Sequence, residues 1–387
     1  MFRRSPTKPI AVGQLQTDVL LPPGLPRTGP AHTFAAMLDA LLEQLRRREN
    51  LSAAQIRDAI PQLTAESVAV ELKAGFLTEL AAKGETTDEI AAFARNLREL
   101  SIQPPLDAET RTREILDVCG TGGDKLNTFN ISTTVAIVCA AAGVTVAKHG
   151  NRAITSQSGS ADVLEALGIR IDLTPEEAAR ALKERRFAFF FAQKYHPAFK
   201  HIGPARKLCA ERGQRTIFNF LGPLMNPARP TAQLIGVPRP QLCEPMAHVL
   251  QSLGIRRGMV VTGLVPVPGT PEPAHLDELS TLGETSIAEF YQDRGFTIST
   301  LAPEHYPLQS ATLADLAGGD REANAGIIRR LLAGEERGPK RDAVLLNAGA
   351  ALFVAGRVKS ISEGWELAAQ HIDDGQARAQ LELLCAP

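Results

Sequence analysis

Apolar residues recur at steps of three and four between residues 33 and 101, and this spacing predicts amphipathic helices. One such face is made by Phe34, Met37, Leu38, Leu41, Leu42 and Leu45. Two capping boxes, beginning at Ser52 and Thr86, mark further helix starts. Another helix is expected to end at Gly84 and to carry Val68, Leu72, Phe76 and Leu80. We therefore predict a small domain of four helices over residues 31–105.

From residue 114 onward, short apolar runs alternate with longer segments that have helix caps and glycine stops. The pattern predicts strands at 114–119, 144–147, 187–191 and 259–261, and helices at 130–142, at 162–167 and from 174 onward. Such alternation is typical of a mostly parallel sheet with helices on its faces. The fold class is therefore α/β, with a small N-terminal helical domain and a large α/β domain over residues 112–387. Ligands of such sheets bind beyond the carboxyl ends of the strands.

The composition narrows the class of protein. The chain has 387 residues, a formal net charge of −1 at pH 7 and 5% aromatic residues. A nearly neutral chain has no overall basic field that would attract nucleic acid or an anionic membrane surface. The five cysteines are dispersed without a CxxC pair, which argues against a disulfide framework and a structural zinc site. No apolar stretch has the length of a membrane helix or a signal peptide, so we expect residues 1–30 to be a flexible N-terminal extension and the protein to be cytoplasmic.

The segment DVCGTGGDKLNTFNIST, residues 117–133, places a glycine-rich turn between a predicted strand and a predicted helix. Glycines let backbone N–H groups approach an anion, and the helix N-terminus adds a favourable dipole. The helix start also offers hydrogen-bond donors for phosphate oxygens, namely Thr128, Asn130, Ser132 and Thr133. The segment has neither GxxxxGK[ST] nor GxGxxG, which argues against a Walker loop and a dinucleotide site. A phosphate site and a simple tight turn are both compatible with it.

Two further polar clusters follow. Residues 148–162, KHGNRAITSQSGSAD, come after a predicted strand and hold donors suited to phosphate and ribose, with Lys148 and Arg152 to offset charge. The alternative for this cluster is a solvated loop. In residues 196–228, Arg206 is spaced to lie near an apolar helix face, where it could clamp a carboxylate. The alternative there is a solvated helix face.

Two adjacent carboxylates, Asp277 and Glu278, follow a predicted strand and a proline-rich loop. This order places them near the ligand edge of the sheet. Two oxygen donors together with the phosphates of a ligand are the usual environment of magnesium in proteins. A solvated turn is the alternative, and the metal interpretation depends on the phosphate loops elsewhere in the chain.

Taken together, these segments resemble the anthranilate phosphoribosyltransferase family. The motifs GTGGD, TFNIST, KHGNR, SGSADVLEALG, RTIFN, GPLxNP and LDELS occur in the order and spacing of that family, from about residue 33 to the C-terminus. The resemblance implies the nucleoside phosphorylase-like phosphoribosyltransferase fold, in which a middle helical segment around residues 195–215 returns to the small domain. It also implies a homodimer formed through the helical domain.

The implied activity joins the phosphoribosyl group of 5-phosphoribosyl 1-pyrophosphate (PRPP) to the amine of anthranilate, an early step of L-tryptophan biosynthesis. By the resemblance, PRPP is bound by Gly120, Gly123, Asp124, Thr128, Asn130, Ile131, Ser132, Thr133, Lys148, His149, Gly150, Asn151, Arg152, Ala153, Ile154, Thr155, Ser156 and Ser160. Anthranilate would contact Gly120, Asn151 and Arg206. Two Mg²⁺ ions would be held, one with help from Ser132 and one by Asp277 with Glu278. No general base is assigned, and His149 is the nearest candidate.

The chain departs from the family pattern at two places. Lys125 follows GTGGD, where a small residue is common, and adds a positive charge near the pyrophosphate. Residues 264–275 form a longer connection before the acids than is usual, with Ala274 and His275 where a glycine is expected. This longer connection could shift the two acids, although it removes neither.

Two other functions are alternatives to this one. Pyrimidine nucleoside phosphorylases share the fold and the glycine turn but not KHGNR or RTIFN, and they would phosphorolyse thymidine or uridine. A non-enzymatic nucleic-acid-binding relative should show a basic stripe and eroded metal acids. The neutral balance of charge and the retained acids favour the transferase, with no nucleic acid or membrane as partner.

Overall fold

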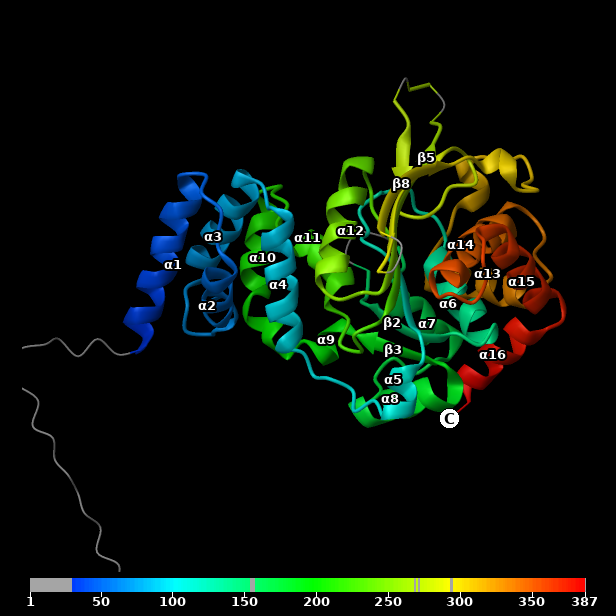
Figure 1. Cartoon of the computed structure of the whole chain (residues 1–387), viewed down its shortest axis with the longest axis horizontal. Coiled ribbons are helices and arrows are strands. Elements are labelled where there is room, and N and C mark those ends of the chain that lie inside the picture. The colour runs from blue at the N-terminus through cyan, green and yellow to red at the C-terminus, as the bar shows by residue number, and fades with distance from the viewer. Residues whose placement is uncertain (1–29, 154–156, 268, 271, 293–294, 387) are drawn as a thin grey trace, which may run out of the picture.

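A computed structural model describes residues 30–153, 157–267, 269–270, 272–292 and 295–386. A helical bundle lies at one end of the molecule, beside a sheet that has helices on both faces (Figure 1). The predictions for residues 1–29 and for Ile154, Thr155 and Ser156 lie outside the described residues, as does the prediction for the side chain of Phe34.

Four helices form the N-terminal bundle, as the apolar spacing predicts. They are α1 (Pro30–Arg46), α2 (Ala53–Thr64), α3 (Val70–Lys83) and α4 (Thr87–Glu99). Both capping boxes are confirmed, since the hydroxyls of Ser52 and Thr86 accept hydrogen bonds from the backbone N–H three residues further on. Gly84 ends α3 with a φ of 90°. Val68 is buried but precedes this helix, so its assignment to the helix was wrong.

One eight-stranded sheet forms the centre of the α/β domain, in the order β3-β2-β1-β4-β5-β7-β8, with β6 paired to β5. The strands are β1 (Ile115–Gly120), β2 (Thr145–Gly150), β3 (Phe187–Phe191), β4 (Ala232–Gly236), β5 (Arg257–Val265), β6 (Ala274–Leu276), β7 (Thr285–Tyr291) and β8 (Gly295–Leu301). The pairs from β3 to β5 are parallel, whereas β6, β7 and β8 join in antiparallel fashion. The prediction of a mostly parallel sheet is confirmed.

Helices cover both faces of this sheet. The longer helices of this domain are α6 (Ile131–Ala141), α7 (Ser160–Leu167), α8 (Pro175–Arg185), α12 (Cys243–Ser252), α13 (Arg321–Leu332), α14 (Pro339–Val354), α15 (Ile361–Asp373) and α16 (Gln376–Cys385), while α10 (Gly203–Glu211) packs on the bundle. Shorter segments are α5 (Ala108–Thr112), α9 (Ala192–Tyr195), α11 (Phe218–Leu221), η1 (Pro197–His201), η2 (Gly222–Met225), η3 (Pro240–Leu242), η4 (Pro303–His305) and η5 (Leu313–Leu316). Helices α6, α7 and α13–α16 enclose the larger core on one face, and α8 and α12 cover the other.

Helix α10 lies against α3 of the bundle, far from it in sequence (Figure 1). The Cys209 thiol contacts the Ala74 carbonyl oxygen at 3.6 Å, and the Thr78 hydroxyl donates a hydrogen bond of 2.8 Å to Gln214 Oε1. One apolar core runs from the bundle through α10 and α12 to the sheet. The bundle is therefore attached to the α/β domain by packing as well as by the chain.

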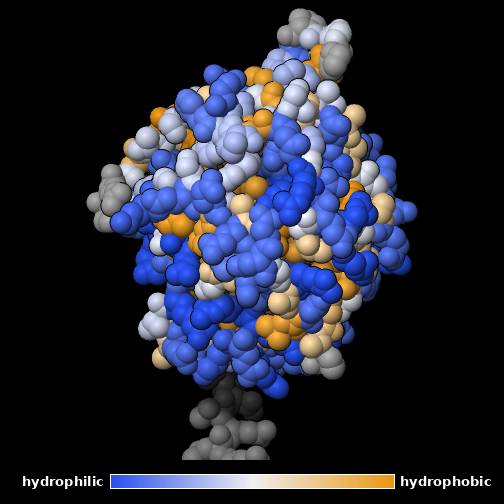
Figure 2. Space-filling model, turned by 90° about the vertical axis from the view of Figure 1, so that its right-hand side faces the viewer, coloured by the Kyte–Doolittle hydropathy of each residue, from blue (hydrophilic) through white to orange (hydrophobic). Residues whose placement is uncertain are grey.

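The face on the side of the C-terminal helices is mostly hydrophilic, with small hydrophobic areas between polar side chains (Figure 2). In the described part of the chain, no helix combines the length and the apolar character needed to cross a membrane.

Candidate active site

The glycine-rich turn connects the carboxyl end of β1 to the start of α6. Positive φ angles recur along it, at Gly122 (76°), Gly123 (90°), Lys125 (63°) and Asn127 (54°). Glycine adopts such angles without a steric penalty, whereas residues with a Cβ rarely do. Reversals of backbone hand point neighbouring N–H groups into one concavity, which is a common way to bind anions. The turn thus has the backbone geometry that a phosphate site requires.

The end of the turn is fixed by α13 and by the segment that precedes it. The Phe129 N–H donates a hydrogen bond of 3.1 Å to the Leu316 carbonyl oxygen, and Asn324 Nδ2 donates one of 2.9 Å to Asn130 Oδ1. A Cβ added to Gly318 would lie 2.8 Å from the Phe129 Cα, so only glycine permits this approach. The N-terminus of α6 is therefore positioned by residues almost two hundred positions later in the chain.

Asp277 lies directly on the glycine turn. Its Oδ2 accepts a hydrogen bond of 2.6 Å from the Gly122 N–H. A Cβ added to Gly120 would lie 2.3 Å from the same oxygen, and one added to Gly236 would lie 1.4 Å from the Asp277 carbonyl oxygen. Gly120 and Gly236 are partners at the ends of β1 and β4. Because the ends of β1 and β4 carry no side chains at Gly120 and Gly236, the segment that contains Asp277 can cross the carboxyl edge of the sheet.

The longer connection before the acids forms a hairpin. Strand β5 continues beyond its pairing with β7 and pairs with β6 from Gly263↔Leu276 to Val265↔Ala274. The stem of this hairpin projects from the sheet at the top of Figure 1. The extra length is thus directed away from the sheet, and Asp277, next after β6, still contacts the glycine turn.

Burial dominates the electrostatics of the acids. Desolvation, followed by repulsion from Asp124 and Glu278, raises the pKa of Asp277 well above its usual value. Desolvation also raises the pKa of Glu278 to about 8, against the opposing effects of the Lys148 ammonium and of a hydrogen bond from the Ser132 N–H. Carboxylates that are buried together favour a bound proton or a cation.

Lys148, in β2, makes hydrogen bonds to residues of β1 and α6. Its ammonium group donates hydrogen bonds to the Val118 carbonyl oxygen at 2.7 Å and to the Ser132 hydroxyl at 3.2 Å. The side chain is buried, and desolvation lowers its pKa. The cation therefore stabilises the junction of β1 with α6, close to Glu278.

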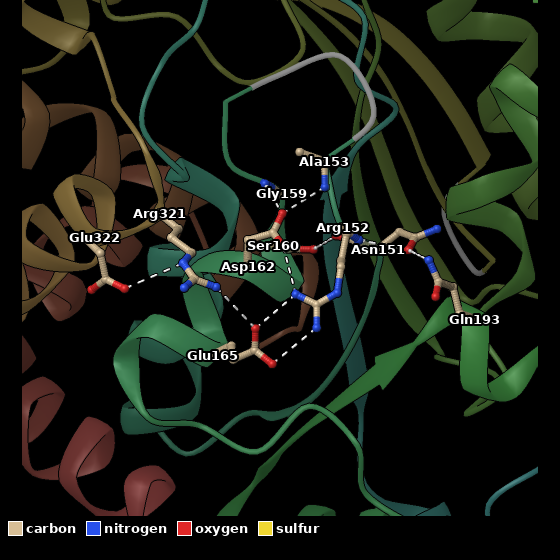
Figure 3. Close-up of polar contacts among 10 residues, drawn as sticks. All are labelled: Asn151, Arg152, Ala153, Gly159, Ser160, Asp162, Glu165, Gln193, Arg321 and Glu322. Carbon is tan, nitrogen blue, oxygen red and sulfur yellow. Dashed lines mark hydrogen bonds and ion pairs between the residues drawn. The ribbon is translucent and has the colours of Figure 1, made fainter.

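Asp162 joins the two described ends of the loop between β2 and α7 (Figure 3). Asp162 Oδ2 accepts hydrogen bonds from the Ala153 N–H at 2.9 Å and the Gly159 N–H at 3.0 Å. The Ser160 hydroxyl donates to the Asn151 carbonyl oxygen at 3.4 Å. A residue of α7 that was not assigned to the site thus holds both described ends of the predicted donor-binding loop.

Two acids of the same helix, α7, form ion pairs with Arg152. Its Nη1 lies 2.9 Å from Asp162 Oδ1 and 3.0 Å from Glu165 Oε2. Glu165 lies 3.6 Å from the guanidinium of Arg321 on α13, so two arginines share this acid (Figure 3). In this arrangement the Arg152 guanidinium is engaged with acids of its own domain.

His149 lies in a buried contact with a second histidine. Its Nδ1 lies 3.1 Å from the Gly222 carbonyl oxygen, and its Nε2 lies 3.2 Å from His196 Nε2. Burial, with a contribution from His196, lowers the pKa of His149 to about 3. The imidazole is therefore neutral at physiological pH and a weak proton acceptor, which argues against its use as a general base.

A row of rings connects this histidine pair to Arg206. His196 stacks on Phe199 with ring centroids 5.1 Å apart, and Phe199 meets Phe218 edge-on at 5.7 Å. The Arg206 guanidinium carbon lies 4.8 Å from the centre of the Phe218 ring.

Arg206 itself is partly buried, which lowers its pKa. Among the described residues, it has neither a hydrogen-bond acceptor nor a carboxylate partner. Within the described ranges, no hydrogen bond joins it to Asn151 or to the glycine turn. An arginine that is stacked on a ring and not paired with an acid remains available to bind a carboxylate.

Sequence reasoning missed several residues that shape the site. Asn226 Nδ2 donates to the buried carboxylate of Asp117 at 2.9 Å and to the Ala147 carbonyl oxygen at 2.7 Å, which fastens the GPLMNP turn to β1 and β2. The turn motif was visible in the sequence, but its partner was not. Gly236 and Asn324 carry no local signal at all, because their roles depend on contacts with distant segments.

Comparison with known proteins first defines a class. The glycosyl transferase family, helical bundle domain, matches residues 39–101, and the glycosyl transferase family, a/b domain, matches residues 112–378. The chain therefore has the two-domain organisation of this class of glycosyl transferases.

Individual relatives with high sequence identity identify the particular family. The chain is 47% identical over 350 residues to an anthranilate phosphoribosyltransferase from Lacticaseibacillus casei, covering 90% of this chain and 97% of that protein. It is 44% identical over 365 residues to one from a Geobacter species, with 90% and 98% covered. The chain belongs to the anthranilate phosphoribosyltransferase family.

Solved structures agree with this assignment. The crystal structure of the Thermus thermophilus anthranilate phosphoribosyltransferase is similar with a TM-score of 0.78 at 42% identity, covering 89% of this chain and 98% of that one. The enzyme of Saccharomyces cerevisiae in complex with PRPP and Mg is similar with a TM-score of 0.77 at 26% identity, covering 90% and 96%.

Proposed function

We propose that this chain transfers the phosphoribosyl group of PRPP to the amine of anthranilate, giving N-(5-phosphoribosyl)anthranilate and pyrophosphate in an early step of L-tryptophan biosynthesis. The observation that carries the proposal is the contact of Asp277 with the glycine turn. This contact brings two adjacent carboxylates, Asp277 and the buried Glu278, to the place where an anion would meet backbone N–H groups. Anions and carboxylates repel each other, so the arrangement suits a ligand that arrives with a cation.

The donor set fits magnesium. Glu278 is buried and Asp277 partly buried, and carboxylate oxygens suit a small hard cation. Among the described residues, no three histidine, cysteine, aspartate or glutamate side chains form a complete metal site, so phosphate oxygens of the donor would supply the other ligands. We propose two Mg²⁺ ions, one on these acids and one near Ser132. Bound magnesium would supply the positive charge that offsets the leaving pyrophosphate.

The proposed donor-binding residues come from two strand ends. The glycine turn would offer the N–H groups of Gly123 and its neighbours, and the start of α6 would add the hydroxyls of Ser132 and Thr133. Residues 148–156 with Ser160 would complete the site from the end of β2. These two segments are neighbours because β1 and β2 are adjacent parallel strands whose carboxyl ends lie at one edge.

The chemistry needs charge stabilisation more than proton removal. The bond from ribose C1 to the pyrophosphate oxygen breaks, and a bond from C1 to the anthranilate nitrogen forms. Positive charge develops on the sugar and negative charge on the leaving group, where the backbone donors of the turn would act. The amine nitrogen attacks with its own lone pair and loses a proton afterwards. A neutral, weakly basic His149 is compatible with this sequence of events.

The acceptor would be held by its carboxylate. Arg206, stacked on Phe218, offers a guanidinium that can make two parallel hydrogen bonds to a planar carboxylate. Asn151 and Gly120 would contact anthranilate from the sheet edge. Placement of both reactants can remove several kcal/mol from a barrier, about 7 or more in favourable cases.

We also propose a homodimer formed through the helical domain and a cytoplasmic location. The location is supported by the cysteines, all of which are free thiols, four of them buried. Unpaired thiols are typical of a reducing compartment.

The decisive assay mixes the protein with Mg²⁺, PRPP and anthranilate and follows the loss of anthranilate fluorescence. We expect turnover that depends on all three components. A folded protein without turnover would contradict the proposal. Phosphorolysis of thymidine or uridine with inorganic phosphate tests the rival function, and we expect none.

A further inference from the structure

Lys125 has a backbone conformation that its side chain disfavours. It follows Asp124 in the glycine turn with a φ of 63°, in the left-handed region where glycine is the favoured residue. Its neighbours in the turn, Gly122 and Gly123, meet the same demand without a side chain. A long cationic residue at a position suited to glycine costs folding stability, and residues in such conformations cluster at active sites and ligand clamps.

The other cations of the proposed donor site are already engaged. Lys148 is buried and donates to Val118 and Ser132, and Arg152 pairs with Asp162 and Glu165. Lys125, by contrast, is exposed, and within the described ranges its ammonium group has no hydrogen-bond or ion-pair partner.

We propose that Lys125 is a further donor-binding residue of this chain, whose ammonium group binds the diphosphate group of the donor and thereby lowers the dependence of donor binding on magnesium. The inference rests on the proposed function for the identity of the donor. Its physical basis is that an ammonium group on a flexible stem is a point charge that phosphates bind well, and that it lies one residue from Asp124 at the rim of the turn. The charge opposes the acids that otherwise surround this region.

The test measures binding of inorganic pyrophosphate by calorimetry, with Mg²⁺ and separately with a chelator, together with the melting temperature. Lys125→Gly removes both the charge and the disfavoured φ, Lys125→Gln removes only the charge, and Lys125→Arg keeps both. We expect Lys125→Gly to melt at a higher temperature and yet to bind pyrophosphate at least fivefold more weakly, with the larger loss in chelator. Lys125→Gln should lose the same affinity without the gain in melting temperature, and Lys125→Arg should bind within twofold of the unaltered chain.

A matched control is Arg48→Gly, which replaces another exposed cation with a φ of 63°, outside the site in the turn after α1. It should leave pyrophosphate binding unchanged. A purely structural role for Lys125 would move melting temperature and affinity in the same direction.

The inference is overturned if Lys125→Gly binds pyrophosphate like the unaltered chain in both conditions, or if the unaltered chain binds it in neither. The outcome is distinct from that of the transferase assay. A chain without turnover whose pyrophosphate binding depends on Lys125 would contradict only the proposed function.

Discussion

The carboxylate of Asp277 accepts a hydrogen bond of 2.6 Å from the backbone N–H of Gly122, a residue 155 positions earlier in the chain. The contact joins the glycine turn after β1 to the acidic pair that follows the hairpin of β5 and β6. It depends on Gly120 and Gly236, where any Cβ would collide with Asp277. The proposed chemistry depends on this closeness, because a cation can act on a leaving pyrophosphate only when its protein ligands and the phosphate loop share one site.

Replacing both acids should abolish most activity. Asp277→Ala combined with Glu278→Ala removes the proposed metal ligands, and we expect kcat/KM to fall by roughly a hundredfold or more and the Mg²⁺ concentration for half-maximal rate to rise. Steady-state kinetics over a magnesium titration measures both. Glu284→Ala, at an exposed acid nearby in sequence, is the control. Unchanged magnesium dependence in the double variant would remove the metal assignment.

Replacing Arg206 should separate the two substrates. Arg206→Ala removes the guanidinium over Phe218, and we expect the KM for anthranilate to rise by roughly tenfold or more, in keeping with the loss of charge-assisted hydrogen bonds, while the KM for PRPP changes little. Arg212→Ala, at the exposed end of the same helix, should alter neither. An equal rise in both KM values would place Arg206 outside the acceptor site.

A single methyl group at Gly236 should displace the acids. Its Cβ would lie 1.4 Å from the Asp277 carbonyl oxygen, so the crossing segment must move. We expect Gly236→Ala to lower the free energy of unfolding by about 2 kcal/mol or more, measured by denaturant titration, and to reduce activity in parallel with weaker magnesium binding. Gly203→Ala, where an added Cβ meets no atom within 4 Å, is the control. A Gly236→Ala variant with normal stability and rate would show that this crossing does not position Asp277.

The buried carboxyl of Asp117 should give the stability a distinct pH dependence. Desolvation raises its pKa from 3.8 to about 6, even though Asn226 and the His149 N–H donate hydrogen bonds to it. The folded state therefore binds the proton more tightly than the unfolded state, so this group lowers stability as pH rises from about 4 to above 6. The full effect is about 3 kcal/mol.

Asp117→Asn should remove this component. Denaturant unfolding at pH 4.5 and at pH 7.5 gives the change in free energy for each protein, and we expect a smaller loss on raising the pH in the variant. We also expect the variant to be less stable at both pH values, because its new amide N–H group faces donors from Asn226 and Gln233. Identical pH slopes in the two proteins would mean that Asp117 is ionised in the folded state with a normal pKa.

Interactions that lie within one helical turn or one strand could be predicted from the sequence. The capping boxes at Ser52 and Thr86 involve residues three positions apart, and their side chains need no distant partner. Four strands of the parallel part, β1, β2, β3 and β5, were predicted from apolar runs such as residues 187–191. Strands β4, β6, β7 and β8 were not predicted, and β8 is largely exposed and lacks a marked apolar pattern.

Part of the proposed site could be predicted and part could not. The glycine turn and the acids each stand out locally, and family resemblance placed them together. By contrast, the engagement of Arg152 with Glu165, and the ring row from His149 to Arg206, depend on how α7 and α10 pack. A cation in a polar loop has the same sequence pattern whether it is free or paired with an acid. Its burial and its partners are therefore decided by the tertiary structure.

By itself, the sequence determined the local structure and the chemical groups available: periodic helices, buried strands, a turn rich in glycine and two neighbouring acids. These properties follow from short-range sterics, capping and apolar spacing. Only the tertiary structure decided that Asp277 meets Gly122 across the ends of β1 and β4 and that Asn324 holds Asn130. It also decided that Lys125 is exposed, with no hydrogen-bond or ion-pair partner among the residues that the structure describes. These contacts depend on the strand order and on close packing. They join segments far apart in the chain, so a local sequence pattern does not predict them.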